Sequence, residues 1–282
     1  MSTLCVTADQ ATVVARRVAR LLALGDSTVV GLGDPLPGGK WRGFAPLLAE
    51  AAGVDVETSF LNLSFAGARM GAVRRWQLPD ALASRPDVAV VIAGMNDTLR
   101  SDFDPLQVRD DFAAIVDELS AIGCLVLTVR YHDHAQLFRL PAPLRRALRQ
   151  RISALNAVID QVVAAHDVVC LDLEDMPGVY DPAAWSVDRL HPSEYGHRCL
   201  ASAFSRVLVD VGRAVPAAVR LECSGGVPST RGRRAWWLAS QGVPWVWRRG
   251  RDFVPYAAAI MAKDLWDRLS EVAARSEPFA TE

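Results

Sequence analysis

The stretch "LLALGDSTVVG", residues 21–31, is an apolar run that stops abruptly at Gly25, Asp26 and Ser27. A run without polar alternation is typical of a strand that is buried on both faces, as in a parallel sheet. The Gly-Asp-Ser at its end has two interpretations. Ser and Asp are common turn residues because their side chains bond the local backbone. Alternatively, Ser27 is a nucleophile held at the end of a buried strand, and the rest of the chain has to decide between the two.

Short β-rich runs alternate with helical patterns through residues 1–213. The runs cover residues 20–25, 56–63, 87–94, 124–130 and 167–172. After Asp104, a plausible helix N-cap followed by Pro105, apolar residues recur on one helix face up to a closing Gly123. These are Val108, Phe112, Ile115, Leu119 and Ile122, and a second long helix repeats the pattern at Leu144, Leu148, Ile152, Leu155, Ile159 and Val162. The alternation predicts a three-layer α/β/α sandwich with right-handed crossovers.

Composition excludes several classes of protein. The 282 residues are 51% hydrophobic and 22% charged, with a formal net charge of −1, so no global field favours nucleic acid or an anionic membrane. The apolar run at 88–95 is too short to span a membrane. The first ten residues lack the basic and apolar segments of a secretory signal. Five cysteines without paired spacing fit reduced thiols, and we expect a cytoplasmic protein.

The amino-acid composition changes after Gly212. Residues 214–282 contain five of the eight tryptophans and a local excess of arginine, and we expect a second unit here, a C-terminal extension with two short helices. Aromatic residues bury large areas, so the extension can simply pack on the domain formed by residues 1–213. A lid or acyl-binding wall over Ser27 and a partner surface are the alternatives.

The residues that follow the predicted strands carry the chemistry, because ligands of open parallel sheets bind at the carboxyl ends of the strands. The stretches are "GDS" at 25–27, "NLSFAGAR" at 62–69, "GMNDT" at 94–98 and "DRLHPSEYGH" at 188–197. A serine needs an imidazole to take its proton, and that imidazole needs a carboxylate on its other nitrogen. Ser27, His191 and Asp188 supply these groups. Donors for an oxyanion are the N–H groups of Ser27 and Gly67 and the side chain of Asn96.

These blocks resemble the SGNH hydrolases, also called GDSL esterases and lipases, over about residues 19–213. The four residues for which that family is named match Ser27, Gly67, Asn96 and His191 in order. The resemblance implies a flavodoxin-like five-stranded parallel sheet with strand order 2-1-3-4-5. Thr28 directly after Ser27 is a mild departure from the usual pattern. The G-x-S-x-G elbow of the other common serine-hydrolase fold is absent, because Val29 stands at its last position.

The resemblance implies a serine esterase that needs no cofactor or metal and acts on small-molecule carboxylic esters, including short acyl, lipid or sugar esters. An acyltransferase with the same triad and a non-catalytic ligand-binding module are the alternatives. The sequence leaves the oligomeric state open.

Several other residues have weaker interpretations. Asp26 and Asp97 are expected to order the loops beside the site. The "HDH" at 132–134 looks like a metal cluster or a rival base, but it has no third ligand at a recognisable spacing. His166 and His197 look like histidines on helix surfaces.

Overall fold

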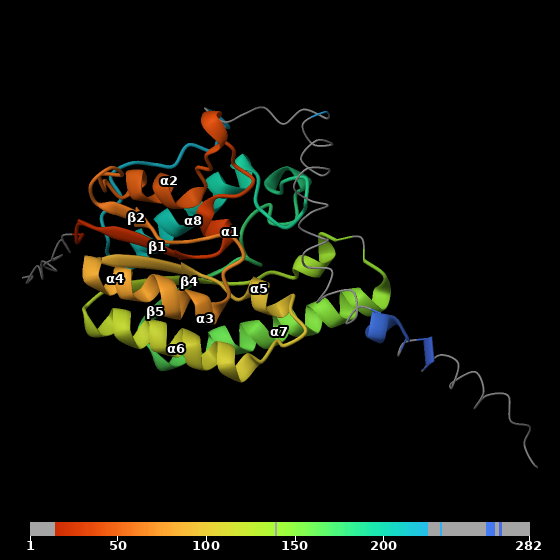
Figure 1. The fold of residues 1–282 in the computed structure, drawn as a ribbon. Coiled ribbons are helices and arrows are strands. Elements are labelled where there is room, and N and C mark those ends of the chain that lie inside the picture. The colour runs from red at the N-terminus through yellow and green to blue at the C-terminus, as the bar shows by residue number, and fades with distance from the viewer. Residues whose placement is uncertain (1–14, 139, 225–231, 233–257, 263–264, 267–282) are drawn as a thin grey trace, which may run out of the picture.

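A five-stranded parallel sheet forms the centre of the molecule (Figure 1). The computed structural model describes residues 15–138, 140–224, 232, 258–262 and 265–266. The strands are β1 (Leu21–Gly25), β2 (Phe60–Asn62), β3 (Val88–Ile92), β4 (Leu125–Arg130) and β5 (Val168–Asp172). Their order is β2-β1-β3-β4-β5, which confirms the predicted fold class and topology.

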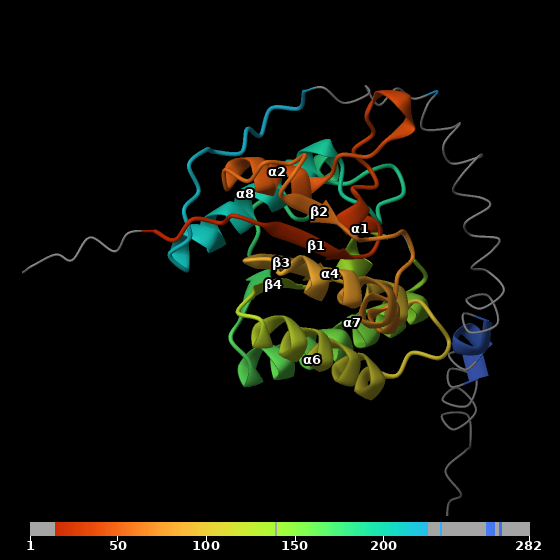
Figure 2. The same cartoon turned by 60° about the vertical axis from the view of Figure 1, so that its left-hand side comes forward.

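Helices cover both faces of the sheet. The helices are α1 (Ser27–Val30), α2 (Phe44–Ala51), α3 (Met70–Ala72), α4 (Leu78–Ser84), α5 (Met95–Thr98), α6 (Pro105–Ala121), α7 (Ala142–Ala165) and α8 (Glu194–Asp210). Short 3-10 turns occupy η1 (Pro37–Gly39), η3 (His134–Gln136) and η4 (Pro182–Ala184), and η2 (Val73–Gln77) is a π-helical turn. Figures 1 and 2 show α2 and α8 on one face and α4, α6 and α7 on the other.

The order of the strands places a switch point between β1 and β3. The chain passes from β1 outward to β2, then returns to the other side of β1 to form β3, so the two connections leave in opposite directions. All residues of β1 and β3 are buried, as their continuous hydrophobicity predicts. Ligands of such sheets bind at this point, and the short helices α1 and α5 begin there (Figure 1).

Helix α6 follows its predicted pattern closely. The Asp104 side chain accepts a hydrogen bond from the Leu106 N–H, so Asp104 is the N-cap, and Pro105 is the first helical residue. Of the predicted apolar face, Val108, Phe112, Ile115 and Leu119 are buried. Ile122 is 39% exposed because the helix ends at Ala121, so its assignment to the buried face is wrong.

The second strand is much shorter than the run at 56–63 predicts. The Asp55 side chain accepts hydrogen bonds from the N–H groups of Glu57 and Thr58, and the Asp55 carbonyl accepts one from Ser59 N–H. This local turn satisfies the backbone groups that a strand would need. The strand therefore begins only at Phe60.

The residues after α8 run along the core rather than away from it. Ala214 N–H donates to the Arg16 carbonyl, and Ala217 N–H donates to the Ala51 carbonyl. Residues 258–262 and 265–266 are helical. Most of the Trp- and Arg-rich part of the extension lies outside the described residues, and the boundary at 213/214 stays a prediction.

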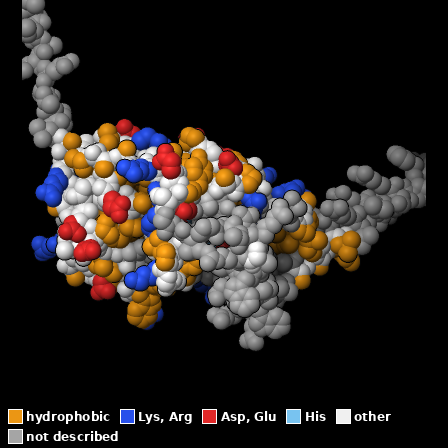
Figure 3. Space-filling view, turned by 90° about the horizontal axis from the view of Figure 1, so that it is seen from above, with side chains coloured by type: hydrophobic (Ala, Val, Ile, Leu, Met, Phe, Trp, Pro, Cys, Tyr) orange, Lys and Arg blue, Asp and Glu red, His pale blue; other side chains and the backbone are white. Residues whose placement is uncertain are grey.

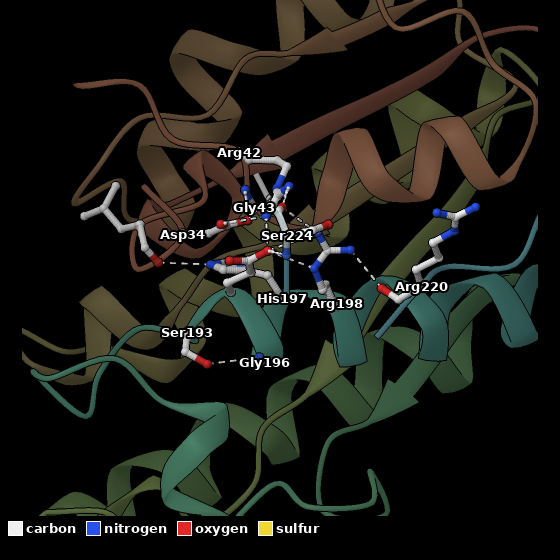
Figure 4. A network of polar contacts seen from close by, with 11 residues as sticks. Asp34, Arg42, Gly43, Ser193, Gly196, His197, Arg198, Arg220 and Ser224 are labelled. Carbon is white, nitrogen blue, oxygen red and sulfur yellow. Dashed lines mark hydrogen bonds and ion pairs between the residues drawn. The ribbon is translucent and has the colours of Figure 1, made fainter. Parts of the chain in front are cut away.

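A polar network fixes residue 224 against the start of α8 (Figure 4). The Glu194 carboxylate accepts hydrogen bonds from Arg42, Arg198 and the Ser224 N–H. The two guanidinium groups also donate to the Ser224 carbonyl, at 2.9 and 3.1 Å. Asp34, which is completely buried, holds Arg42 from the other side through two hydrogen bonds. The segment that ends at Ser224 is thereby tied to α8, the helix that follows His191.

The surface carries mixed charge. On the face in Figure 3, basic and acidic side chains are interspersed rather than gathered by sign, in keeping with the net charge of −1. Among the described residues, no helix is both long enough and apolar enough to cross a bilayer.

Candidate active site

The turn after β1 presents Ser27 at the carboxyl edge of the sheet. The Asp26 side chain accepts a hydrogen bond from Thr28 N–H at 3.0 Å and caps helix α1, of which Ser27 is the first residue. The Ser27 N–H points out of the first helical turn and has no hydrogen-bond acceptor among the described residues. Ser27 is partly exposed, whereas Asp26 is buried.

Gly25 fixes where this turn begins. Its φ of 145° lies outside the range that side chains tolerate well, and an added Cβ would stand 2.0 Å from the Ile92 carbonyl oxygen. The Gln77 side chain, 2% exposed, donates to the Gly25 carbonyl at 2.9 Å and accepts from its N–H at 2.7 Å. β2 pairs with β1 only as far as Ala23, and beyond it the Gly25 carbonyl receives one long backbone hydrogen bond, from Phe65 N–H at 3.4 Å. The Gln77 amide therefore supplies most of what a neighbouring strand would supply at the residue before Asp26.

The loop before α8 holds a carboxylate and an imidazole together. Asp188 Oδ1 accepts hydrogen bonds from the Ser186 hydroxyl and from the N–H groups of Leu190 and His191, at 2.6, 2.9 and 3.0 Å. Asp188 Oδ2 lies 2.6 Å from His191 Nδ1. Because the helix begins at Glu194 with Ser193 as its N-cap, His191 is not a helix cap.

His191 connects this loop to the turn after β1. Its Nε2 lies 2.7 Å from Ser27 Oγ. A carboxylate only accepts, so the proton of a neutral His191 is on Nδ1 and Nε2 accepts from the Ser27 hydroxyl. The structure thus brings the predicted Ser27, His191 and Asp188 into one hydrogen-bonded chain.

The surroundings of Asp188 favour its ionised form. Burial alone would raise the pKa of Asp188, but the hydrogen bond and charge of His191, with help from Ser186, outweigh it and lower the pKa to about 2. Asp188 is therefore ionised at neutral pH and stabilises a positive charge on His191.

Asp26 has the opposite environment. Burial raises its pKa from 3.8 to about 6, against the lowering effect of the Thr28 hydrogen bonds. Its second oxygen accepts a hydrogen bond from Asn96 Nδ2 at 3.2 Å. Asp26 is therefore a loop-ordering residue, as the sequence predicts, held at an energetic cost when it is charged.

The candidate oxyanion donors lie around the same turn. Asn96 Nδ2 also donates to the Ala68 carbonyl at 3.1 Å, so both of its N–H groups already have acceptors. Gly67 precedes Ala68, has a φ of 84°, and its N–H has no acceptor among the described residues. Asn62 Nδ2 ties the start of this loop to the Val29 carbonyl in α1, and Phe65 N–H donates to the Gly25 carbonyl, so the loop that contains Gly67 is bonded to the turn on both sides of Ser27.

A second buried carboxylate orders the neighbouring loop. Asp97 accepts hydrogen bonds from the Met70 N–H and from the Arg69 side chain, both at 3.1 Å. Burial raises its pKa, although Met70 and Arg69 act in the lowering direction. The expected structural role of Asp97 fits these contacts, because they fix the start of α3 immediately after Gly67 and Ala68.

A mostly apolar cavity of about 60 Å³ opens beside Ser27. Apart from the residues already described, its walls include Ile92, Met95, Leu99, Val129, Tyr131, His132, His134, Leu173, Met176, Trp185 and Leu200. The space accommodates a small group attached to a carbonyl at Ser27 Oγ.

The "HDH" stretch is in the wall of this cavity. His132 and His134 are 1% and 3% exposed, and their rings contact each other. The described residues contain no group of three or more His, Cys, Asp or Glu that could hold a metal. His134 Nε2 contacts the Arg189 carbonyl, whereas Ser27 contacts His191.

One histidine was misjudged from its helical position. His197, predicted on a helix surface, is completely buried, and its Nε2 lies 3.0 Å from the Leu32 carbonyl. Burial lowers its pKa to about 4. The error arises because α8 packs against α2, where the His197 ring stacks on Phe44.

The model of the GDSL-like Lipase/Acylhydrolase family matches residues 23–199, more than half of the chain. The chain belongs to this family. It is accordingly a serine hydrolase that acts on ester bonds. A search of curated proteins finds no match.

Solved structures share the fold of this GDSL-like hydrolase. A lipase/acylhydrolase from Enterococcus faecalis has 19% identity and a TM-score of 0.52, covering 69% of this chain and 95% of that one. LAE5, an alpha/beta hydrolase enzyme from the Lake Arreo metagenome, has 20% identity and a TM-score of 0.53, covering 68% and 95%. A catalytic mutant of Axe2, an acetylxylan esterase from Geobacillus stearothermophilus, has 21% identity and a TM-score of 0.52, covering 67% and 94%.

Sequence reasoning missed Gln77 in this hydrolase. In the stretch "VRRWQLPDAL", residues 73–82, Pro79 suits the first turn of a helix that begins just after Gln77. The π-helical geometry of η2, which turns Gln77 towards Gly25, leaves no mark in the sequence. A lone glutamine among charged and apolar residues was the only available signal.

Replacing Gln77 by Leu should damage both stability and activity of the hydrolase. The Gly25 N–H loses its buried acceptor, which costs about 1–3 kcal/mol, and the Gly25 carbonyl keeps only the longer hydrogen bond from Phe65 N–H. We expect a loss of unfolding free energy of this order in urea titrations and a lower kcat. Gln161→Leu, at an exposed position on α7, is the matched control and should change neither quantity. Equal behaviour of the two variants would contradict the role of Gln77.

Replacing Asp26 by Asn should change the pH dependence of stability. The raised pKa of Asp26 means that its contribution is most favourable below pH 4 and is lost as the pH rises through 6. The stability of Asp26→Asn relative to the wild type should therefore increase between pH 4 and pH 8, by on the order of 1–3 kcal/mol. Thermal unfolding at both pH values measures this double difference. A difference that stays constant between the two pH values would refute it.

Proposed function

We propose that this hydrolase cleaves carboxylic esters of small molecules through a Ser-His-Asp triad and an acyl-enzyme. The observation that carries the proposal is the continuous hydrogen-bonded chain from Ser27 Oγ through His191 to Asp188, with links of 2.7 and 2.6 Å. A non-catalytic binding module has no need for these three groups in this order.

The first half of the reaction forms the acyl-enzyme. Ser27 Oγ attacks the ester carbonyl while its proton moves to His191 Nε2, and the imidazolium is stabilised by ionised Asp188. The tetrahedral intermediate then collapses. The bond to the alcohol oxygen breaks, and His191 returns the proton to that oxygen, which leaves as the free alcohol.

The second half regenerates the enzyme. A water molecule gives its proton to His191 Nε2 as its oxygen attacks the acyl carbonyl. The second tetrahedral intermediate collapses, Ser27 Oγ takes the proton back, and the carboxylic acid leaves. An alcohol that reaches the acyl-enzyme in place of water would make the same steps an acyl transfer.

Ser27 N–H and Gly67 N–H are the proposed donors to the oxyanion. They are supported by their lack of other acceptors among the described residues. Asn96 is the proposed third donor, and it has to exchange one of its present hydrogen bonds for the substrate oxygen. The bond to Asp26, at 3.2 Å, is the longer of the two. Preorganised donors of this kind stabilise developing charge in the transition state.

The cavity supports a short acyl group. Its volume of about 60 Å³ corresponds to roughly four to six water-sized groups. An acetyl to butyryl chain fills this volume, and a long fatty acyl chain would extend beyond it. The structural similarity to an acetylxylan esterase is in keeping with this substrate class, since that enzyme removes acetyl groups.

Replacing Ser27 by Ala should abolish turnover of p-nitrophenyl acetate, because no other residue that the structure describes offers a nucleophile bonded to His191 Nε2. Labelling by a fluorophosphonate probe should disappear as well. Ser84→Ala, at the exposed end of α4, is the control and should behave as the wild type. Retained activity and labelling in Ser27→Ala would remove Ser27 from the mechanism. A wild type that binds esters but neither turns over nor labels would favour the binding module.

Acyl length should matter strongly. Between p-nitrophenyl butyrate and p-nitrophenyl decanoate, we expect kcat/KM to fall by about tenfold or more, because added methylenes force apart a packed wall. Steady-state kinetics on the acetate, butyrate, hexanoate and decanoate esters measure the trend. A rate constant that stays level or rises with chain length would contradict the short-acyl proposal.

A further inference from the structure

The stretch after β4 places two buried imidazoles side by side. Asp133, between them, has φ −70° and ψ 77°, and His134 N–H donates to the His132 carbonyl at 2.8 Å. This inverse γ-turn brings both rings to one side of the chain. His132 Nε2 and His134 Nδ1 are 3.0 Å apart.

The hydrogen bonds of the pair determine where its protons are. The Arg189 carbonyl, 2.9 Å from His134 Nε2, can only accept, so His134 carries its proton on Nε2. His134 Nδ1 is then an acceptor and His132 donates to it from Nε2. His132 Nδ1 is left as a buried acceptor, and it has no hydrogen-bond partner in the described part of the chain.

Both rings are neutral at physiological pH. Burial lowers the pKa of His132 to about 4, and burial together with the neighbouring His132 lowers that of His134 to about 3. Trp185 packs against both rings, with ring centroids 5.0 and 4.8 Å away. An uncharged, enclosed pair of this kind fixes geometry and carries no charge to the reaction.

The carbonyl that His134 holds belongs to a strained residue, Arg189. We call residues 186–191, which contain Asp188 and His191, the catalytic loop. Arg189 has φ 58°, a left-handed conformation that is unfavourable for a residue with a side chain. Arg189 lies directly after Asp188 and two residues before His191. Such a conformation persists only where the surroundings enforce it.

Most hydrogen bonds of this loop are internal. Arg189 N–H donates to the Ser186 carbonyl, and Ser186 N–H donates to the His191 carbonyl. The bond from His134 comes instead from the segment after β4, and it links the strained peptide to the sheet. A loop held only by itself can shift as a unit, whereas a loop tied to the sheet keeps a fixed distance from Ser27.

We propose that His134 is a positioning residue for the reaction. Its Nε2–H holds the Arg189 carbonyl, so that Asp188 and His191 keep the positions in which His191 Nε2 contacts Ser27 Oγ. His132 sets the tautomer of His134 by donating to its Nδ1. This inference rests on the proposed function, because Asp188 and His191 are taken as the acid–base pair. The "HDH" stretch is accordingly a support for the catalytic loop, neither a metal site nor a rival base.

Two substitutions separate the hydrogen bond from the packing. His134→Leu fills similar space without a donor, whereas His134→Gln offers an amide N–H that can reach the Arg189 carbonyl. We expect kcat for p-nitrophenyl acetate to fall by roughly tenfold or more in His134→Leu, since small misplacements of catalytic groups are costly. KM should change by less than about threefold, because leucine replaces histidine in one part of the cavity wall with a side chain of similar size. In His134→Gln, kcat should stay within about threefold of the wild type.

A second readout does not depend on turnover. The short Asp188–His191 hydrogen bond should give a low-field proton resonance in the wild type and in His134→Gln, and His134→Leu should broaden or lose it. If wild-type Ser27 neither turns over esters nor reacts with the probe, the proposed function fails, and the resonance still tests the positioning role.

The inference is overturned if folded His134→Leu keeps wild-type kcat and an unchanged resonance. It is also overturned if kcat falls as much in His134→Gln as in His134→Leu, because the activity then depends on the imidazole ring and not on the hydrogen-bond donor. Should His134→Leu not fold, His134→Gln and His132→Phe decide. His132→Phe retains an aromatic ring against Trp185 but removes the donor to His134 Nδ1, so that His134 is no longer held in one tautomer. This variant should lower kcat by about two- to fivefold. Wild-type kcat in His132→Phe, or a loss of more than about tenfold in His134→Gln, contradicts the proposal.

Discussion

The hydrogen bond between Ser27 Oγ and His191 Nε2 joins two loops that are 164 residues apart in the chain. Neither loop can form it alone. The parallel sheet brings both to one edge, and each loop then needs its own brace. Gln77 holds the end of β1, and the Asp188 carboxylate closes the loop before α8 around His191. The chemistry proposed for this hydrolase depends on these two braces acting at the same time.

The site is built from buried polar groups, each with a partner and each with a cost. Asp26 and Asp97 are desolvated carboxylates, and burial raises the pKa of both. Asp188 is also largely shielded, but His191 keeps it ionised. In the proposed mechanism, a stable charge beside His191 assists proton transfer, whereas Asp26 and Asp97 contact the backbone of the surrounding loops. The buried carboxylates at this edge of the sheet lower the stability of the fold. Burial of the apolar side chains of the strands and of α6 offsets this cost.

The features that could be predicted from the sequence are those that depend on the pattern of side chains along the chain. Continuous apolar runs marked β1 and β3, and the spacing of Asp188 and His191 indicated one loop with both groups. What it could not predict depends on backbone acceptors. The partners of Gln77 and His134 are the peptide groups of Gly25 and Arg189, and a sequence does not mark which carbonyl lies opposite a side chain. His197 was misplaced for a related reason, since helical periodicity did not reveal that its ring packs on Phe44.

The most direct test is a crystal structure of the protein after reaction with diethyl p-nitrophenyl phosphate, whose phosphoryl oxygen stands in for the oxyanion. The account predicts phosphorus bonded to Ser27 Oγ, with that oxygen within hydrogen-bond distance of the Ser27 and Gly67 N–H groups. It also predicts that the Asn96 amide has left Asp26 for the same oxygen, and that His191 still contacts Asp188. An unmodified Ser27, or a phosphoryl oxygen that meets neither N–H group, would contradict it.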